Sequence, residues 1–127
     1  MNAQSGSKRR NYDRVARLNR VLKEVIAEEI ERESEFDDRL VLLTVTDVVV
    51  DPDLKRARVF LASLTEETEI ALAEIRVAIQ RRVGREMRLK RTPLLSFEVD
   101  RSLEAGERIE AILRRVSQPK DHDEEGE

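Results

Sequence analysis

The chain has 127 residues, the size of one typical domain, and 40% of them are charged, against roughly 25% in an average soluble domain. The formal net charge is −3, and because the chain has no cysteine and one histidine, disulfides and a thiolate nucleophile are excluded and no cofactor or metal is expected. The longest apolar stretch, residues 40–50, is interrupted by polar residues and is too short for a membrane span, so we expect a cytoplasmic protein.

Residues 11–34 carry apolar side chains at intervals of three and four, the pattern of an amphipathic helix. Basic side chains line the flank of its apolar stripe; they are Arg10, Arg14, Arg17 and Arg20. From Lys8 to Lys23 the chain has seven basic residues and one acid, a local net charge of +6. Residues 28–38 reverse this balance with seven acids and one arginine, a local net charge of −6. Charge is therefore segregated along the chain, and the overall value of −3 hides a strongly basic stretch.

Two strands are predicted next. Residues 41–50 are β-branched and apolar, and residues 57–62 alternate between apolar and polar side chains. Between them, Asp51, Pro52 and Asp53 supply the chemistry of a tight turn. We therefore expect the two strands to be joined directly by this turn.

A long helix is predicted over residues 63–89, with Ser63 and Glu66 fitting a capping box at its start. Its apolar residues share an arc of about 120° on a helical wheel; they are Leu72, Ile75, Ile79, Val83 and Met87. Arg81, Arg85 and Arg88 gather on the opposite side. From Arg76 to Arg91 there are seven basic residues and one acid, a second local net charge of +6.

The helix is expected to end before Pro93, because the residue before a proline is biased out of the helical region. Leu95, Phe97 and Val99 then alternate with polar residues and predict a third strand. Residues 102–116 predict a shorter amphipathic helix. The order α-β-β-α-β-α indicates an α+β domain over residues 11–116, with a flexible basic N-terminus at residues 1–10 and a disordered acidic tail at residues 117–127.

Catalytic patterns are missing from the sequence. The single histidine, His122, lies in the acidic tail, and the two acids of the turn are explained by turn formation. Glu98 and Asp100 alternate outward on a strand, and four scattered glycines cannot build a phosphate-binding loop. We therefore expect no enzyme activity and no small-molecule substrate. Aromatic residues are also scarce, so any RNA is expected to be held through its phosphates and not by base stacking.

Three functional classes remain open for this charge pattern. The two basic stretches favour RNA binding, and their simplest alternative is a pair of solvated helix faces. A protein-binding adaptor would use the same helices and predicts an exposed apolar patch and weak salt sensitivity. An RNA-modifying or RNA-cleaving enzyme would need a group of titratable residues in one pocket, and the sequence offers none.

Several motifs, in the same order and at similar spacing, resemble the ribosome-binding factor A family of bacterial small-subunit assembly factors. They are Arg14-Val-Ala-Arg-Leu-Asn-Arg-Val-Leu, Val45-Thr-Asp-Val with Asp51-Pro-Asp-Leu-Lys-Arg-Ala-Arg-Val-Phe, and Met87-Arg-Leu-Lys-Arg-Thr-Pro-Leu-Leu-Ser-Phe followed by Asp100-Arg-Ser. The resemblance implies a type II KH-like domain. It also implies a non-catalytic, monomeric factor that binds the small ribosomal subunit and its 16S rRNA during late maturation, with links to 16S rRNA processing and cold adaptation.

The sequence departs from this family at one motif. KH domains usually clamp nucleic acid with a Gly-x-x-Gly loop, which is impossible here because no two glycines lie three apart. The family usually has an Ala-x-Gly kink instead, and the corresponding positions here, Ile75, Arg76 and Val77, keep neither residue. The usual arginine after the kink is Gln80. The long helix is therefore expected either to kink as in the family or to run straighter, with Gly84 as its one point of weakness.

We expect the two basic stretches to form one positive face. In this hypothesis Arg14 and Arg17 join Arg81, Arg85 and Arg88, and Arg82, Lys90 and Arg91 extend the face toward the third strand; Arg10 and Arg76 complete the set of predicted RNA-binding residues. Guanidinium groups can each donate two hydrogen bonds to phosphate oxygens and carry little sequence information. The acidic segment at residues 28–38 and the acidic tail are expected to repel non-specific RNA.

Overall fold

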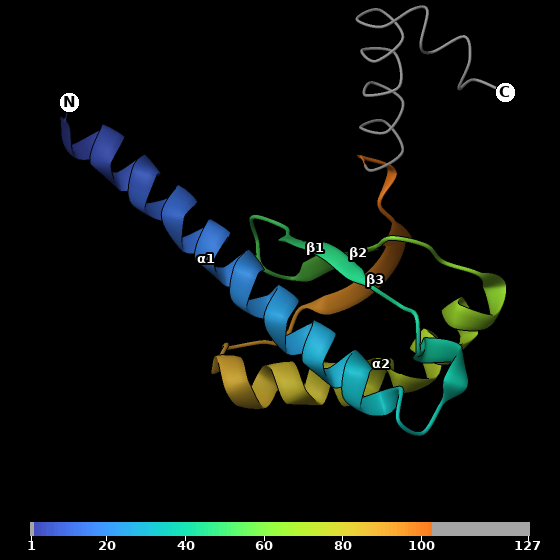
Figure 1. The fold of residues 1–127 in the computed structure, drawn as a ribbon. Coiled ribbons are helices and arrows are strands. Elements are labelled where there is room, and N and C mark those ends of the chain that lie inside the picture. The colour runs from blue at the N-terminus through green and yellow to red at the C-terminus, as the bar shows by residue number, and fades with distance from the viewer. Residues whose placement is uncertain (1, 103–127) are drawn as a thin grey trace, which may run out of the picture.

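Two long helices and three strands make up the part of the chain that the computed structural model describes, residues 2–102, with side chains described from residue 13 (Figure 1). In chain order they are α1 (Asn2–Glu33), the short 3-10 helix η1 (Asp38–Leu40), β1 (Val45–Val50), β2 (Arg56–Leu61), α2 (Glu66–Met87) and β3 (Leu94–Val99). The predicted helix at residues 102–116 and the predicted acidic tail lie outside the described residues, apart from Ser102. Within residues 2–102 no helix is long and apolar enough to cross a membrane.

The three strands form one sheet in the order β1-β2-β3. β1 and β2 run antiparallel with Val48 opposite Val59, which confirms the predicted tight turn between them. β3 runs parallel to β2, with Phe97 beside Val59. A parallel pair needs a crossover connection, and α2 is that connection.

Both helices pack on one face of the sheet. Alternate strand residues on that face are buried, among them Val48, Val59 and Leu95, and they form a single hydrophobic core with buried residues of α1 and α2. The opposite face of the sheet carries exposed side chains such as Arg58 and Ser96. This two-layer arrangement confirms the expected α+β domain.

The apolar stripes predicted on the two helices are confirmed. In α1 the fully buried residues are Leu22, Ile26 and Ile30; in α2 they are Ala71, Leu72, Ile79 and Val83, with Ile75 and Met87 packed against them and partly buried. Arg81, Arg85 and Arg88 are exposed, as the helical wheel predicts. A single helical face therefore supplies the contribution of α2 to the core.

Three predicted boundaries are wrong. The first strand begins at Val45 and not at residue 41, because the amides of Val41 and Leu43 donate to carbonyl oxygens of η1, at 3.2 and 3.3 Å, and cannot join the sheet. α2 is capped by Thr65, whose hydroxyl accepts from the Thr68 amide at 3.1 Å, and not by Ser63. α1 begins at Asn2 and not near residue 11, because extending an established helix costs far less than nucleating one. The division into an N-terminal segment, a domain and a tail stays a prediction.

α2 is one continuous helix, with no break at residues 75–77, where the family usually has its Ala-x-Gly motif. Gly84 has a packing role within it. A methyl group added at Gly84 would lie 2.9 Å from Oγ1 of Thr92, so the absence of a side chain lets the connection between α2 and β3 fold closely against the helix. The glycine that the sequence indicates as a weak point thus positions the connection that carries Lys90 and Arg91.

We expect Gly84→Ala to lower the free energy of unfolding, because the new methyl group must displace Thr92. Alanine by itself favours a helix over glycine by about 1 kcal/mol. In a Thr92→Ala background the same substitution should therefore raise the free energy of unfolding by up to about 1 kcal/mol. Urea denaturation of the wild type, the two single variants and the double variant measures both effects, and a gain in stability while Thr92 is present contradicts the close approach.

Candidate nucleic-acid interface

Eight of the ten predicted RNA-binding residues have exposed side chains. They are Arg14, Arg17, Arg76, Arg81, Arg85, Arg88, Lys90 and Arg91. The side chain of Arg10 lies outside the described part of the structure, and that of Arg82 is largely buried. The exposed residues come from α1, from α2 and from the connection between α2 and β3, so their arrangement depends on how these elements meet.

The turn between β1 and β2 lies between the two basic stretches. A hollow of about 460 Å³ is lined by Arg14, Val15 and Leu18 of α1 together with Pro52 and Leu54 of the turn. A second hollow, of about 540 Å³, is lined by Asp53, Leu54 and Lys55 of the turn together with Leu89, Lys90 and Arg91. Leu54 lines both hollows. The structure therefore brings Arg14 to one side of the turn and Lys90 and Arg91 to the other, so that members of both basic stretches lie at one end of the sheet.

Lys55 is a basic residue of this region that was not predicted as a site residue. Its carbonyl oxygen accepts from the Leu94 amide at 2.9 Å, and its amide donates to Asp53 Oδ1 at 3.0 Å, so the turn is held against the start of β3. The second contact also gives Asp53 the turn-forming role that the sequence predicts. In the sequence, the signal for Lys55 is a short basic run with Arg56 and Arg58, which lies outside the two basic stretches.

Two residues at this site have strained backbones. Leu54 has φ 61° and Arg88 has φ 51°, and they are the only non-glycine residues with positive φ in the described part of the chain. Arg88 ends α2 in the left-handed conformation, at a position where glycine is usual because it has no Cβ to clash. Such conformations cost of order 1–3 kcal/mol and cluster at functional sites.

Arg82 does not share the exposure of its neighbours. Its guanidinium group pairs with Glu28 at 2.6 Å, with Glu29 at 3.4 Å and with Glu86 at 2.6 Å, and its side chain is only 16% exposed. The hydrogen bond with Glu86 is the main reason why the pKa of Arg82 lies above its ordinary value. Because these carboxylates occupy its donors, Arg82 connects α2 to α1 and has few donors left for a phosphate.

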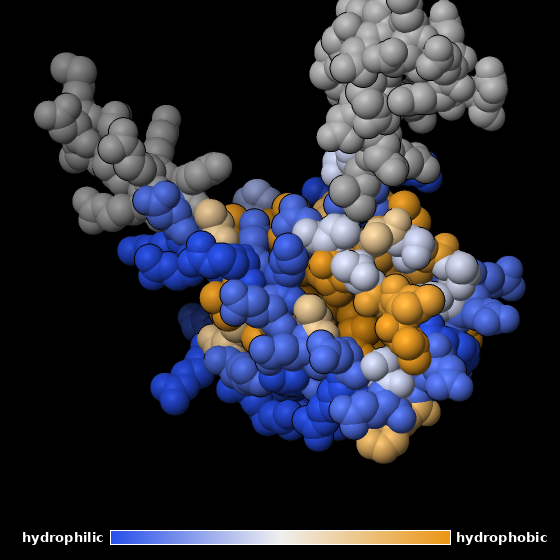
Figure 2. Space-filling view, viewed as in Figure 1, coloured by the Kyte–Doolittle hydropathy of each residue, from blue (hydrophilic) through white to orange (hydrophobic). Residues whose placement is uncertain are grey.

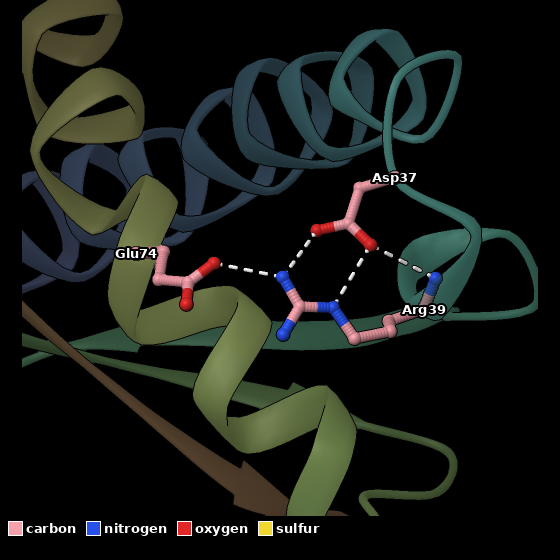
Figure 3. Close-up of polar contacts among 3 residues, drawn as sticks. All are labelled: Asp37, Arg39 and Glu74. Carbon is pink, nitrogen blue, oxygen red and sulfur yellow. Dashed lines mark hydrogen bonds and ion pairs between the residues drawn. The ribbon is translucent and has the colours of Figure 1, made fainter.

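The acidic segment at residues 28–38 also takes part in internal ion pairs. Besides Glu28 and Glu29, Asp37 accepts hydrogen bonds from Nε and Nη2 of Arg39 at 2.9 and 2.7 Å (Figure 3). Nη2 of Arg39 also reaches Glu74 of α2 at 2.7 Å. These bonds from Arg39 lower the pKa of Asp37. Several acidic side chains of this segment therefore hold η1 and α1 against α2. That the segment repels non-specific RNA stays a prediction.

Gln80 occupies the position where the family resemblance implies an arginine. Its Oε1 accepts from the Leu95 amide at 3.3 Å, which links α2 to the start of β3. At the opposite edge of the sheet, Asn19 Oδ1 of α1 accepts a hydrogen bond from the amide of Val50 in β1 at 3.0 Å. Both amide side chains thus hold a helix to a strand end near the basic region.

Comparison with known proteins settles the family. Residues 14–113 match the sequence profile described as Ribosome-binding factor A. The chain belongs to the ribosome-binding factor A family. A ribosome-binding factor A from Thermomicrobium roseum is 38% identical over 116 residues, which are 87% of this chain and 89% of that protein.

Solved structures of the same family confirm the expected KH-like fold. The crystal structure of ribosome-binding factor A from Thermus thermophilus aligns with a TM-score of 0.60 and 32% identity, covering 67% of this chain and 94% of that one. A homology model of the T. thermophilus ribosome-binding factor A, fitted into the cryo-EM map of a 30S complex of that factor, aligns with a TM-score of 0.54 and 31% identity. It covers 64% of this chain and 89% of its own.

We expect Arg82→Ala to lower the free energy of unfolding by about 1–3 kcal/mol, because Glu29 would stay buried without its partner. Arg81→Ala is the matched control, since Arg81 is the preceding residue and is exposed, and it should change stability by less than about 0.5 kcal/mol. Urea denaturation of both variants is the measurement. Equal effects would show that Arg82 is not a structural residue.

We expect Arg88→Gly to raise the free energy of unfolding by about 0.5–1 kcal/mol, because glycine adopts the left-handed conformation without a steric penalty. Arg88→Ala should give no such gain, since alanine keeps the Cβ that causes the strain. Thermal unfolding followed by circular dichroism compares the two variants. A gain of the same size for alanine would mean that loss of the charge, and not relief of the backbone, stabilises the fold.

Proposed function

We propose that this protein binds the free small (30S) ribosomal subunit during late maturation, contacts its 16S rRNA and supports 16S rRNA processing without catalysing a reaction. The observation that carries the proposal is the meeting of exposed basic side chains from α1, the β1–β2 turn and the α2–β3 connection at one end of the sheet. Membership of a family of ribosome-binding factors supports it, as does the related T. thermophilus factor fitted into a 30S complex.

RNA contact is assigned to the exposed basic residues. These are Arg14, Arg17, Arg76, Arg81, Arg85, Arg88, Lys90 and Arg91, with Lys55 added and with Arg10 kept from the sequence prediction. Arg82 is left out because its guanidinium is held by Glu28, Glu29 and Glu86. Contacts of this kind bind the phosphates of a folded RNA and take their specificity from its shape. We expect the protein to act in the cytoplasm as a monomer.

The competing function is that of a protein-binding adaptor whose basic face is only solvated. The two functions differ in their salt dependence, because each phosphate contact releases counterions and weakens binding as salt rises. Co-sedimentation with isolated small subunits and with whole 70S ribosomes at two salt concentrations separates them. Salt-sensitive binding to free small subunits, with little binding to 70S ribosomes, supports the proposal, and binding to neither particle contradicts it.

We expect Arg81→Glu with Arg85→Glu to weaken binding to small subunits by roughly ten- to a hundred-fold. The slope of log affinity against log salt should become shallower by the amount that about two phosphate contacts contribute. Both residues are exposed and lie away from the core face of α2, so the fold should persist. The matched control is Arg32→Glu with Arg101→Glu, which changes the net charge equally at exposed positions outside the assigned set. Unchanged binding by the first pair, or an equal loss in the control, contradicts the assignment.

A further inference from the structure

Leu54 is an exposed apolar residue at the basic end of the sheet. Its side chain is 40% exposed, and it lines both of the hollows that flank the β1–β2 turn, so it lies between them. Each hollow has positive charge on its wall, from Arg14 on one side and from Lys90 and Arg91 on the other. The function proposed above uses these cations and gives the apolar side chain between them no role.

Hydrogen bonds within the turn fix the position of Leu54. Its amide donates to the carbonyl oxygen of Asp51 at 2.8 Å, and the Asp51 amide donates to the carbonyl oxygen of Arg56 at 2.9 Å. The Lys55 amide donates to Asp53 Oδ1 at 3.0 Å. The backbone of Leu54 is left-handed, with φ 61°, a conformation that glycine and asparagine adopt more readily than leucine. The turn thus holds an exposed apolar side chain on a backbone conformation of the kind that clusters at ligand contacts.

Each hollow combines apolar walls with positive charge. Beside Leu54, the first is lined by Arg14, Val15, Leu18 and Pro52, and the second by Asp53, Lys55, Leu89, Lys90 and Arg91. Four cations thus face one acid, Asp53, whose Oδ1 accepts from the Lys55 amide. Apolar surface next to positive charge suits a nucleotide, because the faces of its base can pack on apolar groups and its phosphate is an anion.

Another group of exposed apolar residues has the opposite electrostatic surroundings. Phe36, Val41 and Leu42 are each more than half exposed, and Figure 2 shows hydrophobic side chains gathered over the segment between α1 and β1. In the sequence this group adjoins the exposed acids Glu35 and Asp38. Negative charge there disfavours a phosphate, so apolar exposure alone does not select RNA. The cations on both sides of Leu54 make the difference.

We propose that Leu54 inserts between two neighbouring bases of the bound RNA and that the unstacked bases enter the hollows on its two sides. Apolar side chains such as leucine act as wedges of this kind in nucleic-acid complexes. An aliphatic wedge needs no aromatic ring, which agrees with the scarcity of aromatic residues in this chain. It requires a bulge, a loop or a single strand, where bases can be splayed apart. The inference rests on the function proposed above and names the kind of RNA that the site takes.

Affinity for isolated small subunits tests the wedge. We expect Leu54→Asn to weaken binding by about ten-fold or more without changing the slope of log affinity against log salt, because no phosphate contact is lost. Asparagine tolerates the left-handed conformation, so the turn should persist. Leu54→Met keeps an apolar side chain and should bind within about three-fold of the wild type. Leu42→Asn is the matched control, since Leu42 is 90% exposed outside the basic site, and it should leave binding unchanged.

The outcomes separate the wedge from the function on which it rests. Wild-type affinity of Leu54→Asn, an equal loss in Leu42→Asn, or a shallower salt slope in Leu54→Asn overturns the wedge and leaves subunit binding in place. Failure of the wild type to bind small subunits contradicts the proposed function, and the wedge is then decided on isolated RNA.

Tryptophan fluorescence provides that second test. The chain has no tryptophan, so Leu54→Trp introduces a single one. At low salt we expect an RNA hairpin with a bulge to quench its fluorescence at least about two-fold through stacking on the bases, and the same hairpin without the bulge to quench it far less. Leu42→Trp is the control and should respond to neither hairpin.

No quenching by the bulged hairpin, or equal quenching by the two hairpins, overturns the proposal. Absent quenching combined with weakened subunit binding by Leu54→Asn would assign Leu54 to a contact with a protein of the subunit, which also overturns it.

Discussion

The parallel pairing of β2 with β3 determines where the rest of the structure lies. Arg56 begins β2 beside Leu94, the first residue of β3, so the chain must return from the far end of β2 before β3 can start. α2 makes that return across the sheet face and delivers the α2–β3 connection next to the β1–β2 turn. Basic residues that are more than 30 positions apart in the sequence meet there for this reason. If β3 ran antiparallel to β2, it would begin beside the far end of β2, and these basic residues would lie at opposite ends of the sheet.

The arginines of this chain have different roles because their surroundings differ. Arg82 and Arg39 lie against carboxylates and connect α2 to α1 and to η1. Arg81 and Arg85, on the outer side of the same helix, are exposed. Arginine serves both purposes, since its planar group pairs with a carboxylate or a phosphate in the same two-pronged geometry. Neighbours in the sequence can thus have opposite roles when a helix turns them to different sides.

The backbone at the basic end of the sheet departs from relaxed geometry at two residues. Leu54 and Arg88 are both left-handed, and Thr92 packs where Gly84 has no side chain. Natural proteins keep such features when the surrounding structure supports them and a functional surface requires the residue that is there. Arg88 ends α2 in this conformation at a position where glycine is usual.

The sequence by itself determined the two long helices, the three strands, the helical faces and the family, because burial follows the 3.6-residue repeat of a helix and ordered motifs indicated ribosome-binding factor A. Only the tertiary structure decided which of the basic residues form internal ion pairs. Local pattern cannot show that Arg82 meets Glu28 and Glu29, since those partners lie more than 50 positions away and meet it only when α1 packs on α2. Nor could it show that residues 41–44 lie outside the first strand, because amides of this segment donate to carbonyls of η1, whose position depends on the ion pairs of Arg39. Contacts between distant segments decide both outcomes, and no window of neighbouring residues contains them.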